Sequence, residues 1–130
     1  MNEPQLFAQG ASFLLAEDDA LIVMLVEFML GDAGAGRIDV ATSVAQALSL
    51  AESTHFDVAI FDRQLGDGIS FPAAIAARDR GAVIIVASGS PVFDLPEQLA
   101  DAIILSKPFD LSRFERAVVQ ALAQRRHAAA

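Results

Sequence analysis

Five short apolar runs, each followed by a stretch of helical character, constrain the fold of this chain more than any other feature. The clearest run, 83–87, is wholly apolar and β-branched at four of its five positions, as a strand covered on both faces should be. The other runs are 12–16, 38–41, 58–61 and 103–106. This alternation predicts an α/β domain with a doubly wound, five-stranded parallel sheet, and we expect the strand order 2-1-3-4-5.

The segments between and after the strands predict four helices and one irregular connection. We expect the helices at 20–30, 44–52, 70–80 and 110–124. The segment 91–101 contains two prolines and is expected to hold a short helix at best. We expect one domain, 1–130, with its core at 12–124, flexible tails at 1–11 and 125–130, and no output domain.

Composition excludes several classes of function. The chain has 130 residues, no Cys and a net charge of −8, and no face collects Lys and Arg, so direct nucleic-acid binding is disfavoured. The longest apolar stretch is interrupted by Glu27 and is too short for a bilayer span, so we expect no membrane insertion. The absence of Cys and of a secretory pattern at the start predicts a cytoplasmic protein.

Chemically useful residues follow four of the predicted strands. Taken singly, each is more often a helix cap, a turn former or a solvated side chain. In the predicted strand order, however, these four strand ends are neighbours and line one pocket, which favours a functional site. The residues are Glu17, Asp18 and Asp19 after the first strand, Asp62 after the third, Ser88 after the fourth and Lys107 after the fifth.

These residue types suit phosphoryl transfer. Crowded carboxylates repel one another and raise their proton affinity unless a cation compensates them, and Mg²⁺ prefers oxygen ligands. A carboxylate such as Asp62 beside Mg²⁺ can attack phosphorus and form an aspartyl phosphate. Lys107 and the Ser88 hydroxyl would then neutralise and hydrogen-bond the transferred group.

From about 13 to 122 the chain resembles the receiver domain of two-component response regulators, the CheY-like family. Four motifs in order carry the resemblance: 14–19 is similar to the acidic motif of the family, 56–62 to its phosphorylated strand end, 86–89 to its hydroxyl motif and 106–109 to its Lys-Pro motif. The resemblance also implies a cis bond between Lys107 and Pro108.

The resemblance assigns a role to each matching position. It implies Asp62 as the phosphoacceptor, with Ser88 and Lys107 contacting the phosphoryl group. It implies a Mg²⁺ site formed by Asp62, by Asp18 as a direct ligand, by Glu17 through water and by the backbone carbonyl of Gln64.

The resemblance also implies a signalling phosphoacceptor rather than an enzyme. A histidine kinase or phosphotransfer protein would supply the phosphoryl group, and an unknown downstream protein would respond to it. Glu27 is the only charged residue inside the helix 20–30, so an apolar outer face is the expected docking site, with deeper burial or self-association as the alternatives. We expect the docking residues to be whichever of Val23, Val26 and Leu30 are exposed.

Several positions depart from the common pattern of the family. Gly66 stands where many relatives have Pro, Ser88 replaces Thr, and Ile104 replaces the usual aromatic switch. Only 19 positions separate Ser88 from Lys107. This resembles an alphaproteobacterial single-domain subgroup with a Phe-Ala-Thr-Gly-like motif and a shortened fourth helix, and we expect the 91–101 segment to become ordered on phosphorylation.

Three other functions compete with this interpretation. One is an unphosphorylated pseudo-receiver that acts only as an interaction module. The second is an aspartate-dependent phosphatase of the haloacid-dehalogenase type, which normally has a second acid where this chain has Gln64. The third is a flavodoxin-like cofactor binder, which the absence of Trp and Tyr makes a poor match.

Overall fold

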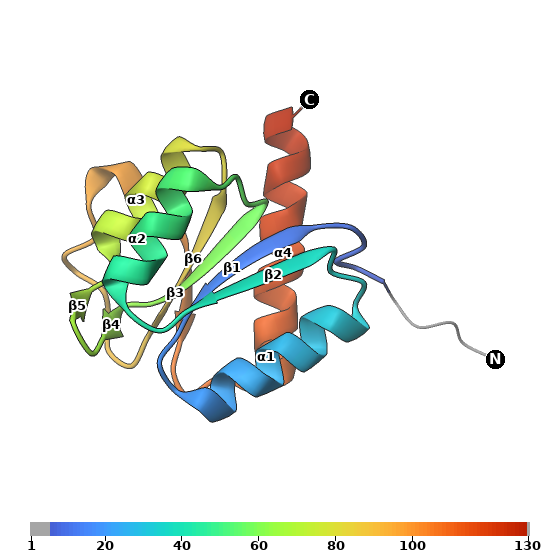
Figure 1. Ribbon diagram of the computed structural model, residues 1–130, viewed down its shortest axis with the longest axis horizontal. Coiled ribbons are helices and arrows are strands. Elements are labelled where there is room, and N and C mark those ends of the chain that lie inside the picture. The colour runs from blue at the N-terminus through green and yellow to red at the C-terminus, as the bar shows by residue number, and fades with distance from the viewer. Residues whose placement is uncertain (1–5, 130) are drawn as a thin grey trace.

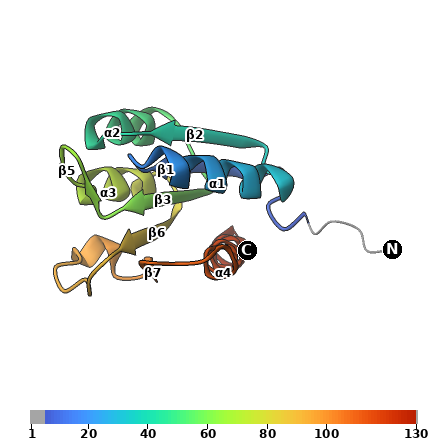
Figure 2. The same ribbon diagram turned by 90° about the horizontal axis from the view of Figure 1, so that it is seen from below.

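Five strands form one parallel sheet. The computed structural model describes the backbone of residues 6–129 and the side chains of residues 6–125. The strands lie in the order β2-β1-β3-β6-β7 (Figures 1 and 2), which is 2-1-3-4-5 when these five alone are counted, so the predicted fold class and topology are confirmed. The strands are β1 (Ser12–Ala16), β2 (Arg37–Ala41), β3 (Val58–Asp62), β6 (Val83–Ser88) and β7 (Ile103–Ser106).

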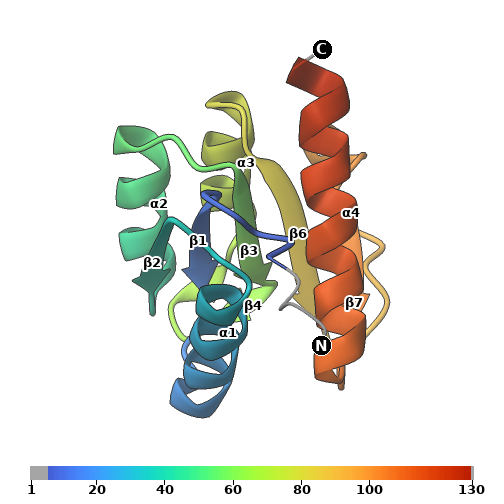
Figure 3. The same cartoon turned by 90° about the vertical axis from the view of Figure 1, so that its right-hand side faces the viewer.

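Helices cover both faces of the sheet (Figures 2 and 3). On β1, Phe13 and Leu15 belong to one buried cluster while Leu14 and Ala16 belong to the other, because successive side chains of a strand point to opposite faces. The first cluster packs against α1 (Ala20–Asp32) and α4 (Leu111–Ala129), and the second against α2 (Val44–Ser53) and α3 (Phe71–Asp79). Both faces of the central strands are therefore buried, which explains their continuous apolar sequence.

The start of β3 is fixed by a buried acid, Asp57, which is 9% exposed. Its Oδ2 accepts a hydrogen bond from the Ser12 backbone N–H at 2.8 Å, and its Oδ1 lies 2.6 Å from Nε of Arg125. This carboxylate thus ties β1 and α4 to β3 at the end of the strand opposite Asp62.

The segment before β1 is more structured than expected. Ala8 is fully buried, and its backbone N–H donates to the carbonyl of Ala33 at 3.0 Å. Gly10 donates to the carbonyl of Gly34 at 2.9 Å. Within the tail predicted at 1–11, residues 8 and 10 thus have backbone partners just after α1, while residues 1–5 lie outside the described part of the chain.

The last helix is also longer than predicted. It was expected to end near Gln124 but continues to Ala129, which includes most of the tail predicted at 125–130, and Ala130 lies outside the described residues. Residues 125–129 contain no Gly or Pro, and Ala is the strongest helix former. None of the helices within residues 6–129 combines the length and hydropathy needed to cross a bilayer.

The connection between β6 and β7 contains no α-helix, and all of its residues are described. Its only regular structure is one turn of 3₁₀-helix, η1 (Glu97–Leu99). Leu99 is fully buried and joins the cluster under α2 and α3, whereas Phe93 is 92% exposed. The predicted shortening of the fourth helix is therefore confirmed.

Candidate functional site

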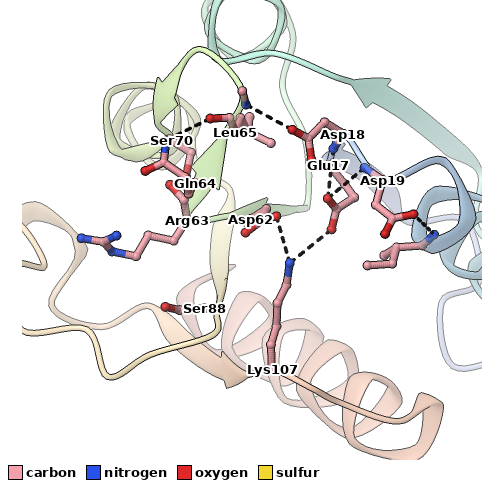
Figure 4. Close-up of polar contacts among 12 residues, drawn as sticks. Glu17, Asp18, Asp19, Asp62, Arg63, Gln64, Leu65, Ser70, Ser88 and Lys107 are labelled. Atoms are coloured by element: carbon pink, nitrogen blue, oxygen red, sulfur yellow. Dashed lines mark hydrogen bonds and ion pairs between the residues drawn. The ribbon is translucent and has the colours of Figure 1, made fainter.

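Four strand ends carry the predicted site residues to one edge of the sheet (Figure 4). Glu17 and Asp18 follow β1, Asp62 ends β3, Ser88 ends β6 and Lys107 follows β7. Because β1, β3, β6 and β7 are consecutive in the sheet, the loops that leave them converge. The structure thus brings the predicted residues into one neighbourhood, although the Ser88 side chain faces a different partner from the others.

Three acids form a cluster with the geometry of a cation site. Glu17, Asp18 and Asp62 each offer a carboxylate oxygen, and these oxygens lie within 4.8 Å of one another. Glu17 is buried, Asp62 is half-buried and Asp18 is exposed. Asp19 is occupied differently, because it caps α1 by accepting from the backbone N–H of Leu21 at 2.9 Å. Oxygen donors of this kind fit Mg²⁺.

Lys107 is the cation that the structure places in this cluster. Its Nζ donates to Oδ2 of Asp62 at 2.9 Å and lies 3.7 Å from Oε1 of Glu17. Burial opposes the charged form, but the hydrogen bond and the charge of Asp62, together with Glu17, raise the pKa of Lys107 above its usual value. The peptide bond from Lys107 to Pro108 is cis, as expected.

The environment of Glu17 raises the pKa of its carboxyl group. Burial raises the pKa of Glu17, backbone hydrogen bonding at Asp19 and the charge of Lys107 oppose this, and the nearby charge of Asp62 raises it further. Its Oε2 accepts from the backbone N–H groups of Asp18 at 3.0 Å and Asp19 at 3.2 Å. Lys107 contacts only Glu17 and Asp62 of the three acids, and a bound divalent cation would favour the charged forms of all three.

A small hairpin borders the acidic cluster. It consists of β4 (Gln64–Leu65) and β5 (Gly68–Ile69), where the sequence predicted no strand. Its link to the cluster is a hydrogen bond of 3.1 Å from the backbone N–H of Gly66 to Oδ2 of Asp18 (Figure 4). The side chain of Gln64 donates to the carbonyl of Leu65 at 3.0 Å. Strands of two residues give no usable alternation in the sequence.

Asp67, at the tip of the hairpin, was missed by the sequence analysis. Its carboxylate accepts from the backbone N–H of Val44 at 2.8 Å and from that of Ala45 at 3.2 Å, at the start of α2. The hydrogen bond from Val44 is the main cause that holds the pKa of Asp67 below its usual value. An Asp between two glycines ordinarily predicts a turn, so no local signal pointed to this long-range contact.

Ser88 is held by the loop that follows it. Its side chain is nearly buried, and its Oγ donates to the carbonyl of Ser90 at 2.7 Å. The same oxygen lies 3.3 Å from the backbone N–H of Ser90. The hydroxyl therefore points away from Asp62 (Figure 4).

A second contact holds the same loop. Nη2 of Arg63 lies 2.5 Å from Oδ2 of Asp94, and the guanidinium lies 5.7 Å from the ring centroid of Phe71. Arg63 directly follows Asp62, but its side chain points away from the acidic cluster (Figure 4). This ion pair joins the end of β3 to the irregular segment and had no signature in the sequence, since the partners are 31 positions apart.

An apolar groove of about 660 Å³ lies beside Lys107, between α1 and the start of α4. The outer side of α1 next to it is apolar, with Phe28 75% exposed. Of the three residues considered for docking, Val26 and Leu30 are buried and Val23 is half-buried. The exposed large apolar residues of α1 are Leu21, Met24, Leu25 and Phe28.

Comparison with solved structures places this site among known relatives. A response regulator receiver protein from Sinorhizobium medicae is 27% identical, with a TM-score of 0.79 and coverage of 89% of this chain and 97% of that one. SdrG from Sphingomonas melonis is 30% identical, with a TM-score of 0.67 and coverage of 87% and 96%. The receiver domain of the sensor histidine kinase PA1611 from Pseudomonas aeruginosa, solved with Mg²⁺ in its active-site cleft, is 24% identical, with a TM-score of 0.72 and coverage of 88% and 98%.

A family model completes the comparison. No curated protein matches the chain. The model of the response regulator receiver domain matches residues 13–119, which is most of the chain and includes all of the site residues described above. The chain therefore belongs to the response regulator receiver domain family, whose members act in two-component signalling.

Proposed function

We propose that Asp62 accepts a phosphoryl group from a histidine kinase or phosphotransfer protein. The observation that supports this most directly is the hydrogen bond from Lys107 to a carboxylate that also belongs to the acidic cluster. A strand-end acid with a paired lysine and two acidic neighbours has a cation on one side and a potential metal site on the other. Such an arrangement suits phosphoryl transfer to the carboxylate.

The reaction forms one bond and breaks one bond. An oxygen of Asp62 attacks the phosphorus of a phosphohistidine, the P–N bond breaks, and the electron pair leaves with the imidazole; with acetyl phosphate, the P–O bond to acetate breaks instead. Lys107 holds Oδ2 of Asp62 before the transfer and would neutralise phosphoryl oxygens after it. The Ser88 hydroxyl would reach the phosphoryl group only after leaving Ser90.

The residues present fit a Mg²⁺ ion. Asp18 and Asp62 would bind it directly, Glu17 through water, and Gln64 through its backbone carbonyl. The bound ion would offset the charge of the incoming phosphoryl oxygens. The Mg²⁺ in the related PA1611 receiver and the clustering of three carboxylate oxygens within 4.8 Å support this assignment.

Intact mass spectrometry tests the phosphoacceptor. Wild-type protein incubated with Mg²⁺ and acetyl phosphate should gain the mass of one phosphoryl group, and removing Mg²⁺ should prevent the gain. Asp62→Asn should remain folded and gain no mass. Mg²⁺-dependent phosphorylation of that variant would overturn the assignment, and a folded wild-type protein that is never phosphorylated would favour an interaction module instead.

We further propose that the kinase or phosphotransfer protein docks on the exposed apolar residues of α1 and the adjoining groove. Met24 and Phe28 lie along one exposed side of the helix. Leu25, which is also exposed, lines the adjoining groove together with Lys107. A helical partner placed there would present its phosphohistidine to Asp62. Because such a partner holds ATP-derived phosphoryl groups, we place the protein in the cytoplasm.

Docking is tested by comparing two phosphodonors. Phe28→Glu should slow transfer from a phosphorylated histidine phosphotransfer domain while leaving transfer from acetyl phosphate unchanged. Val119→Glu, which alters an exposed apolar residue of α4, is the matched control. An equal loss with both donors would show that Phe28→Glu damages the site rather than docking.

We also place the chain in the receiver subgroup with a shortened fourth helix. The irregular connection between β6 and β7 supports this placement, as does Ile104 at the position of the usual aromatic switch. The signal would then leave the site through the segment 89–102, whose loop holds the Ser88 hydroxyl in the structure described here.

A further inference from the structure

The hairpin β4–β5 carries a proposed metal ligand on a very small element. Each of its strands has two residues, and an isolated two-stranded hairpin is at best marginally stable in water. The backbone carbonyl of Gln64 can serve a metal site only if the rest of the molecule holds this hairpin in place.

The base of the hairpin is held by the core. Leu65 is 1% exposed and belongs to the cluster under α2 and α3. The backbone N–H of Ser70 donates to the carbonyl of Arg63 at 2.9 Å, which closes the base. These contacts position the start and end of the hairpin, but they do not reach its tip at residues 66–67.

Two carboxylates hold the tip from opposite sides. On one side Asp18, a proposed metal ligand, accepts from the backbone N–H of Gly66. On the other side Asp67 accepts from two backbone N–H groups of α2, at Val44 and Ala45. The tip is thus hydrogen-bonded both to the acidic cluster and to the start of α2.

We propose that Asp67 is a positioning residue of the metal site. This inference rests on the proposed Mg²⁺ site. If Asp18 holds a cation, its carboxylate would be shared between that cation and the backbone N–H of Gly66, and its hydrogen bond to Gly66 would be weaker. Asp67 then remains as the polar anchor that keeps the tip, and with it the carbonyl of Gln64, in register with the site.

A purely structural role for Asp67 predicts something different. The start of α2 already has its own cap, since Ser43 Oγ accepts from the backbone N–H of Gln46 at 3.1 Å. If Asp67 only supplemented that cap, its removal would lower thermal stability slightly and leave Mg²⁺ affinity unchanged.

Mg²⁺ affinity of matched variants tests the proposal. Asp67→Ala removes both acceptor oxygens, Asp67→Asn keeps one acceptor oxygen but loses the charge, and Asp32→Asn removes an equal charge from the exposed end of α1. Dissociation constants would come from Mg²⁺ titrations of amide chemical shifts, and Tm without Mg²⁺ would check folding. Acetyl phosphate kinetics as a function of Mg²⁺ would provide a second readout.

Asp67→Ala should weaken Mg²⁺ binding about fivefold, the effect of losing roughly one net hydrogen bond. Asp67→Asn should weaken it by about twofold or less, and Asp32→Asn should match wild type. In kinetics, the Mg²⁺ concentration for half-maximal rate should rise in Asp67→Ala while the maximal rate stays constant. Unchanged affinity in Asp67→Ala would overturn the inference, as would an equal loss in all three variants, which would indicate bulk charge. A wild-type protein without any Mg²⁺ response would overturn the proposed metal site itself.

Discussion

The two sides of the site are held by different kinds of contact. On the side of β1 and β3, the hairpin donates from the backbone N–H of Gly66 to Asp18 and accepts from the backbone N–H of Val44 through Asp67. The base of the hairpin is buried in the core through Leu65. On the side of β6 and β7, the segment 89–102 has one turn of 3₁₀-helix and one fully buried large side chain, Leu99.

The polar contacts on the side of β6 and β7 should break at a lower free-energy cost. Ser88 binds a carbonyl two residues away, and the ion pair between Arg63 and Asp94 uses a carboxylate whose side chain is 50% exposed. Exposed ion pairs contribute little to stability, and segments with few buried contacts open at low free-energy cost. The acidic cluster is thus bordered by a hairpin with buried and hydrogen-bonded contacts. The segment 89–102, which would change on phosphorylation, has few buried contacts and should open more easily.

Truncating the buried leucine on each side gives the largest expected effect. Leu65→Ala and Leu99→Ala should each lower the free energy of unfolding by about 2–5 kcal/mol, because each leaves a cavity in the same core cluster. Only Leu65→Ala should also weaken Mg²⁺ binding. Denaturant unfolding and Mg²⁺ titration measure the two quantities, and a similar loss of Mg²⁺ affinity in both variants would remove the distinction between the sides.

Hydrogen exchange should show that the segment 89–102 opens more easily than the hairpin. Amides 92–95 should exchange rapidly in the free protein and about tenfold more slowly with beryllofluoride bound, because the activated Ser88 would pull on the adjoining loop. The amide of Gly66 should be protected more than amides 92–95 in the free protein, since it donates to Asp18. Strong protection of 92–95 in both states would contradict an ordering of this segment.

Removing the ion pair between Arg63 and Asp94 should affect only the segment 89–102. Asp94→Asn should change the free energy of unfolding by at most about 1 kcal/mol, since the carboxylate is half exposed. It should speed exchange of amides 92–95 and leave Mg²⁺ affinity as in wild type. A change in Mg²⁺ affinity would show that Arg63 couples the two sides more tightly than its direction in the structure indicates.

The smallest effect concerns the pH dependence at Asp67. Hydrogen bonds at the start of α2 lower the pKa of this carboxyl in the folded state. Its contribution to stability should therefore be complete above the unfolded pKa of about 3.9 and be lost as the pH falls through the lower, folded value. The Tm difference between wild type and Asp67→Asn should shrink below about pH 4, and a constant difference down to about pH 2 would contradict this account.

Local sequence patterns were enough to predict the strand-end positions of the site residues, but not the long-range contacts that hold the neighbouring loops. Strand-end positions of Asp62 and Lys107 follow from alternation of apolar runs and from strand order, both of which are readable along the chain. The contacts of Asp67 with α2 and of Arg63 with Asp94 join residues 22 to 31 positions apart, so no local spacing encodes them.

The docking face illustrates a different limit of prediction. The helix α1 is apolar nearly all round, so its sequence does not fix which residues face the sheet. Val26 and Leu30 turned out to be buried, while Met24 and Phe28 are exposed. Only packing against the sheet and α4 distinguishes the two sets.

The acids at the two ends of β3 have a consequence for reading a mutational scan. In a survival-based scan, substitutions at Asp57 and Asp62 would score as equally damaging, and both positions would be taken for signalling residues. Asp57, however, joins Ser12 and Arg125 within the scaffold, so its substitutions should reduce cellular protein abundance. Substitutions at Asp62 should leave abundance intact and remove only the signal, so a scan of this protein needs an abundance readout beside the phenotype.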